Sequence, residues 1–339
     1  MFLETSDGSL RNSDAGSPGS TSRMCTRRTR RPGDPRMSGV CMAANVVGIG
    51  LLAVVSSWLM CGAARCESGD RLDRSRLSET FSEEFDGPLS WCSDDCHGER
   101  WRTKYFHSGD SPMSRGLGVS SASEVAMDPK YLSLGINPFK IKDGVLAVEV
   151  RPADAATQQA VRRAWPPWYK GERLAPRFTS GLLTTQFSFK QLYGYFEARV
   201  KVPRLTGGWP AFWLLGPEGT YNEIDIFEIL TGLPHVHRFG QHWGRFGRDK
   251  NMAEIGEAKG SDLSDDFHVY GALWTEREIV YYRDDLEVGR FTNKDLHEPM
   301  YIILSIGMDG SWNTQLDLHS SPSGSGDMLI DFVRAYRVN

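Results

Sequence analysis

The chain has 339 residues, of which 40% are hydrophobic, and a formal net charge of −4. This length fits one large domain or two small ones, and the hydrophobic fraction is sufficient for a sizeable core. The charge gives no basic bias toward nucleic acid, since the basic clusters lie almost wholly in the first 40 residues. The 10 tryptophans indicate either a large core or a surface that stacks on flat ligands such as sugar rings.

The N-terminal part of the chain differs in composition from the rest. Residues 1–39 are rich in Ser, Gly, Arg and Pro, so we expect disorder there, or an extension upstream of a true start at Met24 or Met37. Residues 40–66 hold an apolar run preceded by arginines and followed by small residues, as in a secretory signal peptide. The alternative is an uncleaved signal anchor, because the run is nearly long enough to span a bilayer. Either way we expect an extracellular protein, with membrane attachment only in the second case.

Cys92 and Cys96 are the two cysteines that follow this segment. A small-loop disulfide and half of a zinc site are the two interpretations of their spacing. No second Cys/His pair with ligand spacing accompanies them. We therefore predict the disulfide.

Residues 75–339 are expected to form one domain of catalytic size. Short alternating stretches recur at 144–150, 194–202, 279–283, 301–306 and 328–336, separated by Gly, Pro, Asp and Asn. Many short strands at this spacing predict an all-β sandwich or barrel. The segment 154–176 interrupts them, and we expect a short helix followed by a Pro/Trp-rich loop at the rim of a cleft.

The segment 223–228 concentrates three acids on one predicted strand. Side chains alternate across a strand, so Glu223 and Asp225 share a face while Ile224 and Ile226 face the core. A regular strand would leave Glu228 with the isoleucines. A β-bulge, with its extra residue at about Phe227, would return Glu228 to the acidic face. Clustered acids raise one another's pKa, so this arrangement is costly and indicates a functional reason. Solvated acids on an exposed strand face are the alternative.

Glycoside hydrolysis is such a function. Retaining enzymes hold two carboxyl groups about 5–5.5 Å apart, one as nucleophile and the other as general acid/base. Glu223 and Glu228 can lean together across the strand. Asp225 can then share a hydrogen bond with a neighbour, which tunes that neighbour's pKa.

Longer motifs extend this interpretation. Residues 193–203 (YGYFEARVKVP), 207–216 (GGWPAFWLLG) and 222–228 (NEIDIFE) resemble glycoside hydrolase family 16, in particular its laminarinase-like branch of endo-β-glucanases. Further matches lie at 241–244, 267–275, 297–304 and 329–336, so the resemblance spans about residues 80–338.

The resemblance implies a β-jelly-roll sandwich of two antiparallel sheets, with a carbohydrate-binding cleft on the concave face. It also implies a retaining mechanism in which Glu223 is the nucleophile, Glu228 the acid/base and Asp225 their electrostatic partner. No cofactor is expected for catalysis.

Several substrate-binding residues follow from the same resemblance. Glu197 and Arg199 alternate with apolar residues, and the resemblance places them in the cleft, although a solvated salt bridge is the alternative. Of Trp209 and Trp213 we expect one in the core, with Trp213 the better candidate for a cleft wall.

Four further positions are predicted in this way. His242 and Trp243 resemble a His/Trp pair beside the acid/base, and Trp312 resembles a subsite aromatic residue. Asp331 resembles an acid that helps to hold a structural calcium ion, which prefers oxygen ligands.

Two departures from the family pattern leave the substrate open. Tyr221 stands near the position where relatives active on β-1,3-glucan often carry Trp, and residues 120–125 offer only Glu124 for the non-reducing side. We expect a monomeric retaining endo-β-glycanase acting on β-1,3- or β-1,3/1,4-glucan. Galactan, an exopolysaccharide and transglycosylation are the alternatives. A non-catalytic glucan-binding protein is disfavoured because both glutamates are present.

Overall fold

The computed structural model describes residues 69–94, 96–106, 109–117, 122–308 and 326–339. The predictions for residues 1–39 and 40–66, and the one for Trp312, lie outside the described residues. Within the described ranges, no helix is long and apolar enough to cross a membrane. The predicted Cys92–Cys96 disulfide is present.

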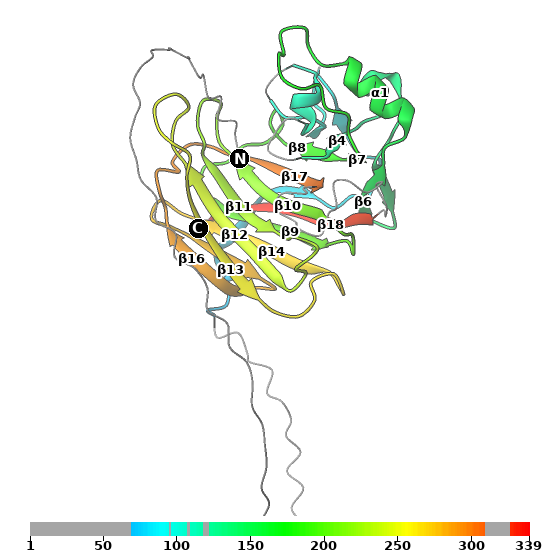
Figure 1. Cartoon of the computed structure of the whole chain (residues 1–339). Coiled ribbons are helices and arrows are strands. Elements are labelled where there is room, and N and C mark those ends of the chain that lie inside the picture. The colour runs from blue at the N-terminus through cyan, green and yellow to red at the C-terminus, as the bar shows by residue number, and fades with distance from the viewer. Residues whose placement is uncertain (1–68, 95, 107–108, 118–121, 309–325) are drawn as a thin grey trace, which may run out of the picture. The chain divides into compact units, whose positions relative to one another are not determined.

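The described strands form two sheets, which confirms the all-β sandwich (Figure 1). The ten-stranded sheet has the spatial order β16 (Leu286–Thr292), β15 (Glu278–Arg283), β14 (His268–Trp274), β9 (Gly194–Lys201), β18 (Gly326–Val338), β6 (Val145–Pro152), β7 (Phe178–Ser180) and β4 (Glu124–Ala126), with β1 (Leu77–Glu83) paired to β18 and β5 (Phe139–Lys142) paired to β6. The eight-stranded sheet has the order β13 (Met252–Lys259), β12 (Val236–Trp243), β11 (Glu223–Glu228), β10 (Gly208–Leu215), β17 (Tyr301–Met308), β8 (Leu182–Thr184), β3 (Trp101–Arg102) and β2 (Trp91–Cys92).

The pairing is antiparallel except at two short places. β2 pairs with β3, and β4 with β7, in parallel. The prediction of two antiparallel sheets is therefore right for the long strands and wrong for these short ones. One α-helix, α1 (Ala155–Arg163), and three 3-10 turns, η1 (Arg74–Arg76), η2 (Pro112–Arg115) and η3 (Tyr131–Ser133), complete the described elements.

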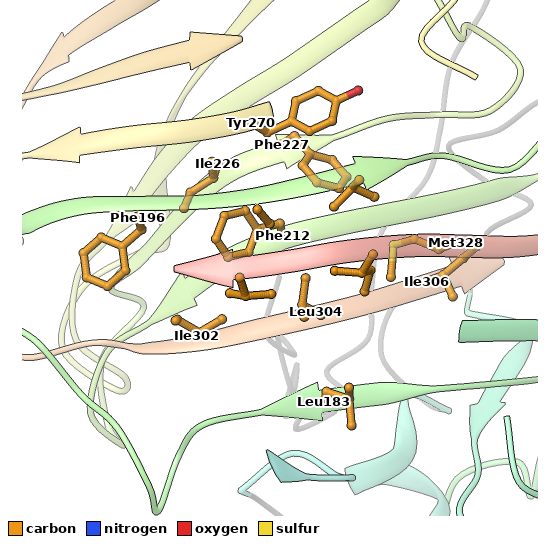
Figure 2. Close-up of a cluster of buried hydrophobic side chains, with 14 of the residues drawn as sticks. Leu183, Phe196, Phe212, Ile226, Phe227, Tyr270, Ile302, Leu304, Ile306 and Met328 are labelled. Carbon is orange, nitrogen blue, oxygen red and sulfur yellow. The ribbon is translucent and has the colours of Figure 1, made fainter. Parts of the chain in front are cut away.

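The core lies between the two sheets because alternate residues of each strand are apolar. Phe196 of β9 points into it from one sheet, and Phe212 of β10 and Leu304 of β17 point into it from the other (Figure 2). Phe227 of β11 meets Tyr270 of β14 with ring centroids 4.4 Å apart. Burial of each such side chain stabilises the fold by roughly 1.5–3 kcal/mol. The strand that carries the three acids is thus fixed from its buried side.

A second apolar cluster surrounds α1. The helix begins where the Asp154 side chain accepts a hydrogen bond from the Thr157 backbone N–H at 2.7 Å, as a helix N-cap does. Val161 and Trp165 are buried against Tyr131. The short helix predicted within the segment 154–176 is therefore confirmed, at Ala155–Arg163.

Candidate active site

Strand β11 contains the predicted bulge. Against β12, Asp225 lies opposite Gly240 and Glu228 opposite Arg238, so three steps on β11 match two on β12. Against β10, Ile226 has no counterpart. Ile226 and its neighbour Phe227 are both fully buried in the core. The bulge therefore sits at Ile226 and Phe227, and Glu228 returns to the face that holds Glu223 and Asp225.

These three acids line one cavity of about 380 Å³. β10, β11, β12, β13 and β17 of the eight-stranded sheet form much of its wall. Described residues before and within β4 also line the cavity. These residues are Arg115, Gly116, Ala122, Glu124 and Ala126. The segment 154–176, which was expected at the rim of the cleft, contributes no residue to the lining of this cavity.

His242 contacts two of the acids. Its Nε2 atom lies 3.4 Å from Asp225 Oδ2 and 3.8 Å from Glu223 Oε1, and its Nδ1 atom lies 3.3 Å from Asn251 Oδ1. The prediction that His242 belongs to the site is supported by this position. Its neighbours differ from the expectation, because His242 lies opposite Glu223 and not beside Glu228.

Burial dominates the titration of the two glutamates. It raises the pKa of Glu223 to about 7 and the pKa of Glu228 well above the usual range, and the negative charge of Asp225 raises both further. His242 opposes these shifts with its positive charge. Burial would lower the pKa of His242, but the hydrogen bond to Asp225 and the charges of Asp225 and Glu223 raise it to about 9. At neutral pH the site therefore holds a cation among carboxyl groups with high proton affinity.

Both predicted tryptophans of β10 line the cavity. Trp213 Nε1 donates a hydrogen bond to Ser305 Oγ at 3.2 Å, and the Tyr105 ring lies 6.0 Å from the Trp213 ring. The expectation that one of the two tryptophans is in the core is wrong, because positions 209, 211 and 213 all lie on the cleft face of the strand. Flat aromatic faces of this kind suit sugar rings.

Trp243 is not in the cavity. It follows His242 directly on β12, so the two side chains point to opposite faces of the sheet. Trp243 packs against the core between the sheets. The substrate-binding prediction for Trp243 is therefore wrong.

The substrate-binding predictions for Glu197 and Arg199 are also wrong. Both belong to β9 in the ten-stranded sheet, and neither lines the cavity. Glu197 is fully buried and accepts hydrogen bonds from Arg74 at 3.1 and 2.6 Å and from the Tyr336 hydroxyl at 3.0 Å. The inward positions of β9 are apolar, so these polar side chains occupy the face of the sheet that points away from the core.

The structure does not support the calcium prediction for Asp331. Its carboxylate forms an ion pair with Arg199 at 2.7 Å, so its charge is already balanced by a guanidinium. Within the described residues, the side chains grouped closely enough to hold a metal ion are Glu223, Asp225 and His242, whose ligand atoms lie within 4.8 Å of one another. Glycoside hydrolysis by two carboxyl groups requires no metal there.

Sequence reasoning missed several residues that line the cavity, three of which carry polar side chains close to the strands of the site. Tyr105, Arg238 and Ser305 line the cleft from a loop, β12 and β17. Side chains alternate along β12, so Arg238 lies on the same face as His242. The sequence pattern could therefore have predicted Arg238. Glu124, considered for substrate binding, uses Oε2 to accept a hydrogen bond from the Met308 backbone N–H at 2.7 Å.

A β-sandwich whose cleft holds two glutamates and an aspartate on one strand defines a class of carbohydrate-active proteins. Residues 155–333 match Glycosyl hydrolases family 16. The chain belongs to this family.

Similar proteins agree with this assignment. The endo-1,3-1,4-beta-glycanase EglC of Rhizobium meliloti (strain 1021) is 35% identical over 273 residues, which are 79% of this chain and 53% of that protein. A beta-glucanase of Rhodothermus marinus is 30% identical over 229 residues, 61% of this chain and 73% of that protein. The laminarinase catalytic domain of Thermotoga maritima MSB8 shares the fold, with a TM-score of 0.59 and 21% identity, covering 78% of this chain and 99% of that chain. The chain spans about half the length of EglC.

Proposed function

We propose that this protein is a retaining endo-β-glycanase that hydrolyses internal bonds of β-1,3- or β-1,3/1,4-glucan. The observation that carries the proposal is the bulge at Ile226 and Phe227, because it brings Glu228 onto the cleft face beside Glu223 and Asp225.

The two glutamates divide the reaction between them. Glu228, whose pKa is raised most strongly, keeps its proton and donates it to the oxygen of the leaving sugar. Glu223 in its ionised form attacks the anomeric carbon and forms a covalent glycosyl–enzyme. Glu228, now ionised, takes a proton from water, and that water releases the sugar with its original configuration.

Asp225 and His242 support these roles. Asp225 hydrogen-bonds to Glu223, and His242 lies within 3.8 Å of both. The imidazolium offsets the charge that Glu223 must carry before it attacks. Removal of the site from water strengthens each of these interactions.

The choice of glucan is supported by two kinds of observation. Trp209 and Trp213 offer aromatic faces on the cleft side of β10, which suit the flat faces of β-linked glucosyl units. Two relatives that are 35% and 34% identical over 79% of this chain are named endo-1,3-1,4-beta-glycanases. Galactan, an exopolysaccharide and transglycosylation by the same site remain the competing proposals.

We further propose that residues 40–66 export the catalytic domain, about residues 75–339, which then meets its polysaccharide as an extracellular monomer. Membrane attachment follows only if that segment is uncleaved. Detection of the chain in the medium, with an N-terminus after residue 60, is the expected result. Retention in the membrane fraction would overturn the export of a free enzyme.

The test of the reaction is a reducing-sugar screen on laminarin, lichenan, agarose, carrageenan and porphyran. We expect laminarin or lichenan to be cleaved to short oligosaccharides, with activity lost in Glu223→Gln and Glu228→Gln. Glu278→Gln removes an exposed acid from β15 and is the matched control. Cleavage of a galactan alone would contradict the substrate, and products longer than the substrate would favour transglycosylation.

A further inference from the structure

Two hydrogen bonds on the buried side of the eight-stranded sheet flank the bulge. His237 of β12 lies with Nε2 2.9 Å from the Ile226 carbonyl oxygen. Tyr281 of β15, in the other sheet, donates its hydroxyl to the Gly240 carbonyl at 2.6 Å. Gly240 lies opposite Asp225, and Ile226 is the next residue along β11. The two hydrogen bonds therefore hold the backbone of the β11–β12 pair at adjacent positions, one at Ile226 and the other at the partner of Asp225.

The Ile226 carbonyl needs this donor because of the bulge. Ile226 has no counterpart on β10, and neither Ile226 nor Phe227 has a counterpart on β12. A bulge interrupts the ladder of backbone hydrogen bonds at its extra residue. A buried carbonyl left without a donor is destabilising, because it has lost its hydrogen bonds to water. The side chain of His237 supplies the hydrogen bond that the ladder loses.

The surroundings of His237 fix its protonation. The side chain is fully buried, with the Phe239 and Tyr270 rings edge-on at 5.6 and 5.2 Å. Among the described residues, Nδ1 has no hydrogen-bond partner. Since the Ile226 carbonyl can only accept, Nε2 carries the hydrogen and Nδ1 does not. Burial lowers the pKa of His237 to about 3, so the ring stays neutral.

We infer that His237 is a positioning residue for Glu228: its Nε2–H holds the Ile226 carbonyl in the bulged conformation, which keeps the Glu228 carboxyl on the cleft face. His237 touches neither the cavity nor the acids, and acts through the backbone of β11. This inference rests on the proposed function, because it assigns to His237 the placement of the acid/base and not of the nucleophile.

The test compares two substrates that differ in their need for a general acid. A polysaccharide requires protonation of its leaving oxygen, whereas the dinitrophenolate of a 2,4-dinitrophenyl β-glucoside or oligoglucoside departs as an anion without it. In His237→Phe the ring is kept and the donor is lost. We expect kcat on the polysaccharide to fall about 10- to 100-fold, with little change in KM. This loss is smaller than the 10²–10⁴-fold that a general acid contributes in full, because Glu228 is displaced and not removed. Formation of the glycosyl–enzyme from the dinitrophenyl substrate stays within about threefold of the wild type.

Three further variants sharpen the comparison. His237→Gln retains a side-chain N–H of similar reach and recovers part of the lost kcat, whereas His237→Asn, one methylene shorter, recovers less. Tyr281→Phe removes the hydrogen bond to Gly240, on the Asp225 side of the bulge, and lowers both substrates' rates by the same factor. If His237→Phe does not fold, the comparison uses His237→Asn and His237→Gln: the rate on the polysaccharide should fall more than the rate on the dinitrophenyl substrate, and by more in His237→Asn than in His237→Gln.

Two results would overturn the inference. One is an equal loss on both substrates in the folded His237 variants, which would make the residue merely structural. The other is unchanged activity on both. A wild-type protein that cleaves neither substrate would instead refute the proposed function, so the two failures are distinguishable.

Discussion

Glu223 lies directly opposite His242 across the β11–β12 pair, with Glu223 Oε1 and His242 Nε2 3.8 Å apart. The same imidazole is 3.4 Å from Asp225. A side chain charged up to a pH of about 9 therefore stands beside the proposed nucleophile.

This relationship predicts how pH controls activity. Glu223 must be ionised to attack, so activity is lost as pH falls through its pKa, which burial raises to about 7. Glu228 must be protonated, so activity is lost as pH rises through its raised pKa. The cation on His242 lowers both values, so in His242→Gln both limbs of the kcat/KM profile move to higher pH. His268→Gln, at an exposed pair with Asp284, is the control. A shift to lower pH would contradict the assignment.

Trp213 of β10 and Trp243 of β12, on the two strands that flank β11, should behave differently. Trp213→Ala removes an aromatic face from the cavity, and we expect KM to rise about 3- to 10-fold, as for the loss of a contact worth 0.5–1.5 kcal/mol. Trp243→Ala removes core packing, and we expect it to lower stability by about 3–5 kcal/mol with KM unchanged. Initial rates and urea unfolding measure the two effects. A rise in KM for Trp243→Ala, with no rise for Trp213→Ala, would show that Trp243 and not Trp213 contacts the substrate.

Glu197 offers a test of the corrected assignment. Glu197→Gln weakens the paired hydrogen bonds from Arg74 on the far side of the ten-stranded sheet. We expect the free energy of unfolding to fall by about 1–3 kcal/mol, because the buried side chain at position 197 no longer carries the negative charge that pairs with Arg74. Activity of the folded variant should equal that of the wild type. A KM effect without a loss of stability would show that Glu197 meets the substrate.

Arg115 and Asp128 form a buried ion pair beside the cleft. Arg115 Nη1 and Asp128 Oδ2 are 2.8 Å apart, and both side chains are fully buried. Arg115→Met removes the cation that balances the buried Asp128 carboxylate, which keeps its hydrogen bonds from Ser93 and Thr103. We expect a cost of about 3–5 kcal/mol in stability. The double variant with Asp128→Leu should recover most of that loss. Chemical denaturation of the two single variants and the double variant gives the coupling, and additive losses would contradict the pairing.

The sequence was most informative where a residue's role depends on its own strand. Period-two alternation placed Glu223 and Asp225 together, and the extra residue needed for Glu228 predicted the bulge found at Ile226 and Phe227. The same alternation separates His242 from Trp243. There the family resemblance was followed in place of the alternation, and the prediction for Trp243 failed.

The sequence was least informative where a role depends on long-range pairing. Glu197 has a polar, alternating context that fits a cleft as well as an outer surface. The position of Glu197 outside the cleft follows from the pairing of β9 with β14 and β18 in the ten-stranded sheet. These partner strands lie more than 60 residues away in the chain. Tyr105 reaches the cavity from a loop with no periodicity to read. His237 looks like an ordinary core histidine until the Ile226 carbonyl is seen beside it.

The central claim is that Glu223 is the nucleophile and Glu228 the acid/base of a retaining glycanase. Azide rescue of alanine variants on a dinitrophenyl β-glycoside tests it most directly. Glu223→Ala should yield the α-glycosyl azide, because azide attacks in place of the missing nucleophile, and Glu228→Ala should yield the β-glycosyl azide through the intact covalent intermediate. The reverse pairing of products, or wild-type activity in Glu223→Ala without azide, would contradict the account.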